Sequence, residues 1–189
     1  MQEISSFQNQ MLIAMPSLQD THFHHGVTFI CQHNTEGALG LVINHPSNMV
    51  LADIFEQMEI EILDTSIANT PIFMGGPVQQ ERGFVLHHRT PDTSWENTIE
   101  VSDTLALTTS RDILKSIARG EGPDKFIITL GYAGWSGQQL EKEIKENAWL
   151  NISSNETVIF DTPISQRWRT AAKTLGLDVE LLTTHIGHA

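Results

Sequence analysis

Cysteine is almost absent from this 189-residue chain. The one cysteine, Cys31, excludes a disulfide within the chain, which suits a reducing compartment. No apolar run approaches the ~20 residues that span a bilayer. The first ten residues, MQEISSFQNQ, lack the positive charge and apolar core of a signal peptide. We therefore expect a soluble, cytoplasmic protein that makes no membrane contact.

Positive charge is also scarce. The chain has 11 Lys and Arg residues against 23 Asp and Glu residues, which gives a net charge of −12. A uniformly acidic surface repels phosphate backbones and anionic membranes. No helix-turn-helix pattern or basic stripe is present, so nucleic acid is an unlikely partner by charge.

The familiar catalytic motifs are missing as well. The sequence contains no G-x-S-x-G elbow, Walker loop, dinucleotide fingerprint or paired-cysteine metal site. Their absence argues against nucleotide cofactors and the common hydrolase mechanisms. We expect no cofactor, and we leave the question of enzymatic activity open while favouring a protein without one.

What the chain does contain is an ordinary globular balance, with 40% apolar and 18% charged residues. Its length fits one domain spanning residues 1–189. Apolar periodicity predicts four helices mixed with about nine short strands joined by tight turns. This mixture favours an α+β fold over a regular alternating α/β fold.

The densest local signal is Lys125–Asn147, KFIITLGYAGWSGQQLEKEIKEN. We expect a buried strand, a sharp turn through 131–135, and a helix that Ser136 caps. Free N–H groups at such a turn form a possible anion site. A tight turn in which Tyr132 and Trp135 fill core space is the commoner alternative, and we prefer it.

Other local patterns are equally explicit. Residues 27–32 and 39–44 read as a hairpin joined by a short loop. Thr109 with Asp112 predicts a capping box before a helix that ends at Gly120. Residues 158–160 and 179–183 are expected to be strands, and Thr162 is expected to cap the last helix.

Several segments together resemble the YqgE/AlgH family of bacterial proteins. They cover nearly the whole chain in order: LIAMPSLQD (12–20), FICQHNTEGALGLVINHP (29–46), GGPVQQERGFVLH (75–87), TTSRDILKSIARGEGP (108–123), LGYAGW and QLEKEI (130–144), RWRTAAKTLGLD (167–178) and GHA (187–189). The resemblance implies an α+β domain with a coiled, bifurcated, mostly antiparallel β-sheet and about four flanking helices. It implies no particular reaction, and some members carry a transcriptional regulator label.

The chain departs from the family pattern at two positions. Gln32 stands where the family usually has glutamate, and Gln138 stands where it usually has glycine. Any chemistry or close ligand contact that depends on those two residues in the family is in doubt here.

Cys31 and His33 are the first candidate site. Residues two apart in a strand share a face, so a thiolate paired with imidazole would be a nucleophile or a redox sensor. A buried, inert cysteine is the commoner alternative.

Asp20, His22, His24, His25 and His33 invite a metal site, but their spacing matches no known ligand pattern, and we expect no metal. The third candidate is the run from Gly75-Gly76 to Glu81-Arg82. Its glycines allow close backbone approach, Arg82 would clamp a carboxylate or phosphate, and Glu81 would act as a base. An internal Glu–Arg pair that fixes a turn is the preferred alternative.

The preferred function is a non-catalytic regulatory module that binds a protein partner or a small ligand. Gly75, Gly76, Arg82, Tyr132 and Trp135 are its candidate ligand-binding residues. A thiol enzyme or redox switch that uses Cys31 is the first alternative. A transcriptional regulator, supported by the family label alone, is the second.

Overall fold

The computed structural model describes residues 5–15 and 20–178. Its strands form one ten-stranded network in the order β10-β1-β2-β3-β9-β6-β8-β7, to which β4 and β5 attach at the side. The strands are β1 (Gln10–Ala14), β2 (Val27–Asn34), β3 (Gly37–Val42), β4 (Pro46–Val50), β5 (Pro71–Met74), β6 (Val78–His88), β7 (Thr98–Glu100), β8 (Leu105–Thr108), β9 (Phe126–Ser136) and β10 (Trp149–Ser153). All pairs are antiparallel except β5 with β9, which confirms the α+β fold.

Four α-helices flank this sheet, as predicted. They are α1 (Leu51–Gln57), α2 (Arg111–Ala118), α3 (Gln139–Lys145) and α4 (Arg167–Lys173). Two 3₁₀ turns (Thr65–Ile67 and Ile164–Gln166) and a π-helical turn (Thr157–Asp161) complete the regular structure of the described residues. None of these helices is long and apolar enough to span a membrane.

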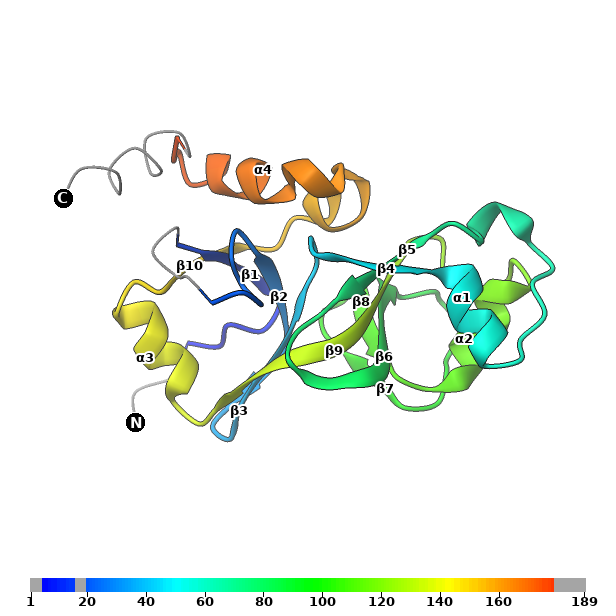
Figure 1. Ribbon diagram of the computed structural model, residues 1–189. Helices are drawn as coiled ribbons and strands as arrows, with labels where there is room; N and C mark the ends of the chain where they lie inside the picture. The colour runs from blue at the N-terminus through cyan, green and yellow to red at the C-terminus, as the bar shows by residue number, and fades with distance from the viewer. Residues whose placement is uncertain (1–4, 16–19, 179–189) are drawn as a thin grey trace.

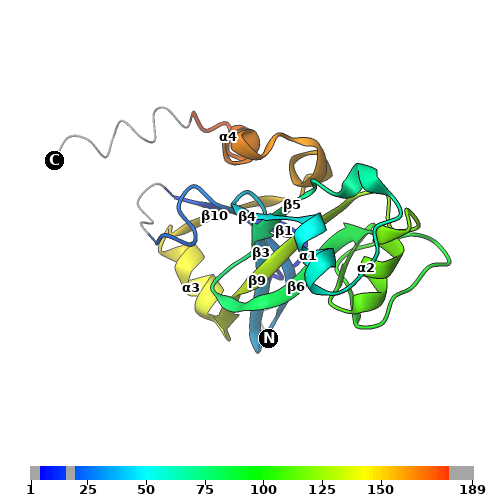
Figure 2. The same ribbon diagram turned by 45° about the vertical axis from the view of Figure 1, so that its right-hand side comes forward.

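Strand β9 divides the sheet in two. Its first half pairs with β5 and β6, and its last residues pair with β3. Figure 1 shows β9 crossing between a lobe that carries α3 and α4 and a lobe that carries α1 and α2; Figure 2 shows the same arrangement after a turn of 45° about the vertical axis. The bifurcated sheet is thereby confirmed.

The sharp turn predicted at 131–135 is wrong. These residues continue β9 as a strand, although Gly131 adopts a φ of 76° that favours glycine. The local glycine pattern reads as a turn, but pairing with β3 holds the chain extended. Ser136 is therefore the last strand residue, and Gln138, at a φ of 67°, is the N-cap of α3.

Other local predictions also differ from the structure. The N-cap of α2 is Ser110 in place of Thr109, and the Asp112 carboxylate accepts a hydrogen bond from the Glu96 N–H. Residues 158–160 lie in the π-helical turn, and Pro163 precedes the 3₁₀ turn that leads into α4. The sequence patterns did not predict β4 and β10. The strand predicted at 179–183 lies outside the described residues.

Three buried clusters fill the space between the sheet and its helices. The largest lies between the central strands and α4, and it includes Phe29, Leu41 and Trp168. The second packs α1 and α2 against the strands of their own lobe and includes Phe55, Ile113 and Ile128. The third lies under α3. Each helix thus covers one part of the branched sheet.

Candidate functional site

Cys31 and His33 do not form a pair. Strand β2 has a bulge between Ile30 and Gln32, and this extra residue breaks the two-residue alternation. Cys31 consequently enters the large core cluster, whereas His33 contacts the Phe7 ring and bonds to Glu141 of α3. The expectation that the two side chains share a face is wrong because of this bulge.

In addition, neither side chain is available for the proposed chemistry. Cys31 is fully buried, and burial raises the pKa of its thiol, which disfavours the thiolate. The Phe7 N–H donates to His33 Nδ1 at 3.0 Å, so Nε2 carries the proton that bonds to Glu141 at 2.8 Å. Neither group is free to act as a nucleophile or a base in this arrangement.

Gly75 and Gly76 lie against the backbone of β9. A Cβ atom at Gly75 would collide with the Gly131 carbonyl, and one at Gly76 would collide with the Tyr132 carbonyl group. These glycines permit two strands to approach closely. The contact accounts for both glycines without a ligand.

Glu81 and Arg82 lie on a wide bulge of β6, between Val78 and Gly83, where both side chains are exposed. Arg82 donates to Gln79 and Thr109, each at 3.3 Å, and its guanidinium covers the Phe84 ring. The predicted internal Glu–Arg pair is absent from the ion pairs of the described residues.

Tyr132 and Trp135 line a shallow groove of about 450 Å³ that the β2–β3 hairpin and β9 form. Cys31, Arg82 and the two glycines at 75–76 do not line it. The Trp135 indole N–H is already used, because it donates to Glu143 at 2.7 Å. Of the predicted ligand residues, these two aromatic ones line this groove together.

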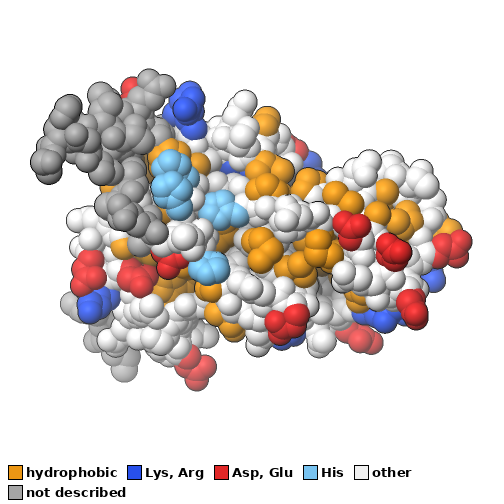
Figure 3. Space-filling model, viewed as in Figure 1, with side chains coloured by type: hydrophobic (Ala, Val, Ile, Leu, Met, Phe, Trp, Pro, Cys, Tyr) orange, Lys and Arg blue, Asp and Glu red, His pale blue; other side chains and the backbone are white. Residues whose placement is uncertain are grey.

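The histidine-rich segment forms a stacked patch. The His25 ring lies between His24 and Trp168, with ring centroids 4.0 and 4.4 Å away. His45 Nε2 bonds to the His24 carbonyl at 2.9 Å, and Figure 3 shows histidine side chains beside apolar ones on this face. Within residues 5–15 and 20–178, no group of three His, Cys, Asp or Glu side chains is arranged to hold a metal.

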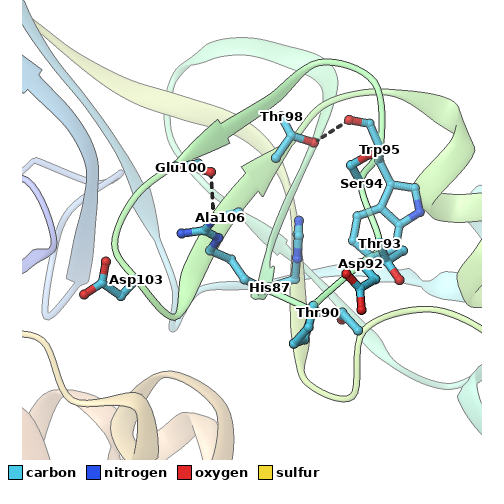
Figure 4. Close-up of a pocket in the computed structure, with 12 residues that line it drawn as sticks. His87, Thr90, Asp92, Thr93, Ser94, Trp95, Thr98, Glu100, Asp103 and Ala106 are labelled. Atoms are coloured by element: carbon cyan, nitrogen blue, oxygen red, sulfur yellow. Dashed lines mark hydrogen bonds and ion pairs between the residues drawn. The ribbon is translucent and has the colours of Figure 1, made fainter.

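A further cavity lies elsewhere, and the sequence patterns did not single it out. We call it the β6–β8 pocket. It has a volume of about 560 Å³ and lies on the sheet surface of β6, β7 and β8, under the 90–95 loop (Figure 4). It is lined by His87, Arg89, Thr90, Pro91, Asp92, Thr93, Ser94, Trp95, Thr98, Glu100, Asp103 and Ala106. This volume is typical of small-ligand sites.

A chain of hydrogen bonds runs through the floor of the pocket. His87 is 1% exposed, and its Nδ1 lies 2.8 Å from the His88 carbonyl. Its Nε2 lies 2.8 Å from Thr108 Oγ1, which is 2.8 Å from Thr98 Oγ1. Burial lowers the pKa of His87, and this effect outweighs the hydrogen bond to the His88 carbonyl, which acts in the opposite direction. A buried imidazole is thus connected through the Thr108 hydroxyl to Thr98, which lines the pocket.

The lining is predominantly acidic and hydroxyl-rich. Asp92, Glu100 and Asp103 oppose one cation, Arg89, which pairs with Glu100 at 2.7 Å. Figure 4 shows Asp103 at one end of the pocket and Asp92 beside Trp95 at the other, with His87 between them. This charge distribution favours a cationic or neutral polar ligand over an anion.

A second cavity, of about 660 Å³, lies beside the first and shares Arg89, Thr90 and Pro91 with it. It contains His88, whose ring nitrogens face Asp124 at 3.2 Å and Glu156 at 2.8 Å. Thr104 donates to Glu156 at 2.6 Å, and this bond is the main cause of the lowered pKa of Glu156. The His88 network ties β6 to the turn after β10.

Sequence reasoning missed the β6–β8 pocket because its residues come from separate segments. The 90–97 region reads as a polar loop, and His87 reads as the end of a strand. Trp95 was the one available signal, since a large aromatic residue in a polar loop packs against something. In the structure Trp95 meets the His87 ring at 5.1 Å and donates to Ser116.

Comparison with known proteins gives consistent findings. A family model described as AlgH-like matches residues 11–180. A UPF0301 protein of Methylococcus capsulatus is 52% identical over 186 residues, covering 98% of both chains. One from Nitrosococcus oceani is 48% identical over 189 residues, covering 100% of both.

Two solved structures are also similar. The solution structure of the AlgH protein from Pseudomonas aeruginosa is 42% identical, has a TM-score of 0.79, and is matched over 100% of this chain and 99% of that one. The crystal structure of a Corynebacterium diphtheriae protein is 16% identical, with a TM-score of 0.70 over 88% of this chain and 85% of that one. This second likeness concerns the fold alone.

Proposed function

Because this chain belongs to the AlgH-like family, whose fold it shares with the Pseudomonas aeruginosa AlgH protein, we propose that it is a non-catalytic regulatory module that binds a small cationic ligand in the β6–β8 pocket. The observation that carries this proposal is a cavity of about 560 Å³ that combines three carboxylates, one aromatic wall and several hydroxyl groups. We place the protein in the cytoplasm.

Charge supports the choice of ligand. Asp92 and Asp103 are pocket residues for which no ion pair is found among the described residues, whereas Glu100 is neutralised by Arg89. The pocket therefore keeps an excess of negative charge. Trp95 adds an aromatic surface, which attracts ammonium and guanidinium groups. An amine or guanidine fits this chemistry, and a phosphate does not.

The thiol and DNA-binding alternatives have less support. Cys31 is fully buried, and its pKa is raised, which disfavours a reactive thiolate. A net charge of −12 opposes contact with a phosphate backbone. The regulation that we propose therefore acts through the bound ligand. That ligand is a free amine or a Lys or Arg side chain that a partner protein presents.

The test is a calorimetric and NMR titration of the purified protein with benzylamine, spermidine and an Arg-containing tripeptide, with glucose and inorganic phosphate as comparisons. We expect benzylamine, spermidine and the tripeptide to bind and to shift the NMR signal of the Trp95 indole N–H, and we expect glucose and phosphate not to bind. Preference for the tripeptide over the free amines would indicate a protein partner. Binding of phosphate in place of the cations would refute the proposal.

Two variants locate the site. Asp92→Asn and Asp103→Asn should each weaken cation binding by about fivefold, since one partly exposed charge contributes about 1 kcal/mol. Glu121→Gln is the matched control, because Glu121 is an exposed carboxylate that does not line the pocket. Equal losses in all three variants would reflect net charge and would argue against this site.

A further inference from the structure

In the hydrogen-bond chain under the β6–β8 pocket, the direction of each hydroxyl bond depends on whether His87 is protonated. Backbone carbonyls only accept, so the His87 Nδ1–H must donate to the His88 carbonyl. When the ring is neutral, Nε2 is a lone pair that accepts the Thr108 hydroxyl proton. Thr108 then accepts from Thr98, so the Thr98 proton is turned toward Thr108 and away from the Trp95 and Glu96 carbonyls, which lie 2.9 and 3.1 Å from its oxygen.

Protonation of His87 reverses this order. Nε2–H now donates to Thr108, Thr108 donates to Thr98, and Thr98 donates to the Trp95 carbonyl, which lies 2.9 Å away. One lone pair of the Thr98 oxygen then accepts the hydrogen bond from Thr108. In the neutral state both lone pairs are available to a ligand N–H group. Thr98 is thus the better acceptor for a cation when His87 is uncharged.

Electrostatics acts in the same direction. A charged imidazolium in the floor adds a positive charge within a few ångströms of the ligand. The charged and titratable groups around His87 are His88 and Arg89 of β6, Glu100 of β7, Asp92 of the covering loop and Asp103 of the β7–β8 turn. Ala106, which lines the pocket from β8, and Thr108, which bonds to His87, carry no charge.

We propose that protonation of His87 and occupation of the β6–β8 pocket by a cation oppose each other, so that the ligand binds at neutral pH and is released in acid. This inference rests on the proposed function. Both the direction of the hydroxyl bonds and the added positive charge disfavour the cation once His87 is protonated. Ligand binding and proton binding are therefore reciprocally linked.

The experiment measures benzylamine binding by calorimetry from about pH 8 down to about pH 5, because burial lowers the pKa of His87 below that of an ordinary histidine, and the amine stays charged throughout. We expect affinity to fall by up to about tenfold as His87 becomes protonated toward the acidic end of this range, because two charges ~7 Å apart interact by this order at an effective dielectric constant of 20–40. Repeating the titration at pH ~6 in buffers with different ionisation enthalpies should show proton release on binding.

Variants assign the linkage to His87. His87→Gln should bind benzylamine with little pH dependence. Thr108→Val, which removes the acceptor of the protonated ring, should move the pH midpoint of binding to lower pH; it serves if His87→Gln does not fold. His88→Gln is the matched control and should keep the wild-type midpoint within about 0.5 unit, since its ring bonds outside the pocket.

The outcomes separate the two proposals. If benzylamine does not bind at any pH, the proposed function fails. If it binds with pH-independent affinity, or more tightly in acid, the linkage fails while the site stands. If His88→Gln removes the pH dependence and Thr108→Val leaves the midpoint unchanged, His88 is the titrating group and the inference for His87 is overturned.

Discussion

Glu143 of α3 accepts hydrogen bonds from two buried indoles. Trp135 and Trp149 donate to its Oε2 at 2.7 and 3.0 Å, and Gln139 donates to its Oε1 at 3.1 Å. The two indoles belong to β9 and β10, and both are buried. This carboxylate therefore joins one helix to two strands that lie apart in the sheet order.

Replacing Glu143 with alanine leaves two buried N–H donors without an acceptor. Each unsatisfied donor costs about 1–2 kcal/mol, so Glu143→Ala should lower the free energy of unfolding by about 2–4 kcal/mol. With a urea m-value of ~2 kcal/mol/M, the midpoint should fall by about 1–2 M. Urea unfolding followed by tryptophan fluorescence measures this change.

Two variants control for other effects. Glu143→Gln keeps an acceptor oxygen and should recover at least half of the loss. Glu146→Ala changes an exposed glutamate at the end of the same helix, and the contact of Glu146 with Lys142 is 3.9 Å long. This variant should lower the free energy of unfolding by less than about 0.5 kcal/mol. If Glu143→Ala costs no more than Glu146→Ala, the bonds to the indoles contribute nothing and the reasoning is refuted.

Three further predictions follow from single residues. Gln138 has a φ of 67°, so Gln138→Gly should relieve left-handed strain and raise the free energy of unfolding by about 0.5–1 kcal/mol in urea; a decrease would contradict this. The pKa of Glu156 is lowered in the folded state, so its contribution is present above the unfolded pKa of about 4.3 and is lost as pH falls through the folded value. Glu156→Gln should therefore show a shallower loss of stability in acid, and an unchanged acid slope would exclude this role. Cys31 is fully buried with a raised pKa, so a thiol reagent should modify it only in denaturant; rapid labelling of the native protein would restore the thiol hypothesis.

The sequence predicted the parts of the fold that local patterns determine. The hairpin of β2 and β3, the four helices and the end of α2 before Gly120 follow from periodicity and glycine placement. The glycines of β9 misled because a residue at positive φ occurs in a bulged strand as well as in a turn. Only the partner strand, β3, which lies some 95 residues away in sequence, decides between them.

The candidate sites were less predictable, again because of long-range contacts. A one-residue bulge separates Cys31 from His33, and no local pattern announces it. The β6–β8 pocket joins residues from three strands, a loop and a turn that become neighbours only after the sheet forms. Gln138 is a different case: the family's usual glycine there raised the question of chemistry or a ligand contact, whereas the positive φ of this residue gives a backbone reason for glycine at the position.

The sharing of β9 between both halves of the sheet has a mechanical consequence. Its first residues pair with β5 and β6, and its last residues pair with β3. Cutting the chain before or after β9 gives two fragments, and only one of them keeps this inner strand. The two fragments therefore need each other to complete the sheet. Separately expressed halves should become structured only after they recombine, and the amide protons in the middle of β9 should be among the slowest to exchange with solvent.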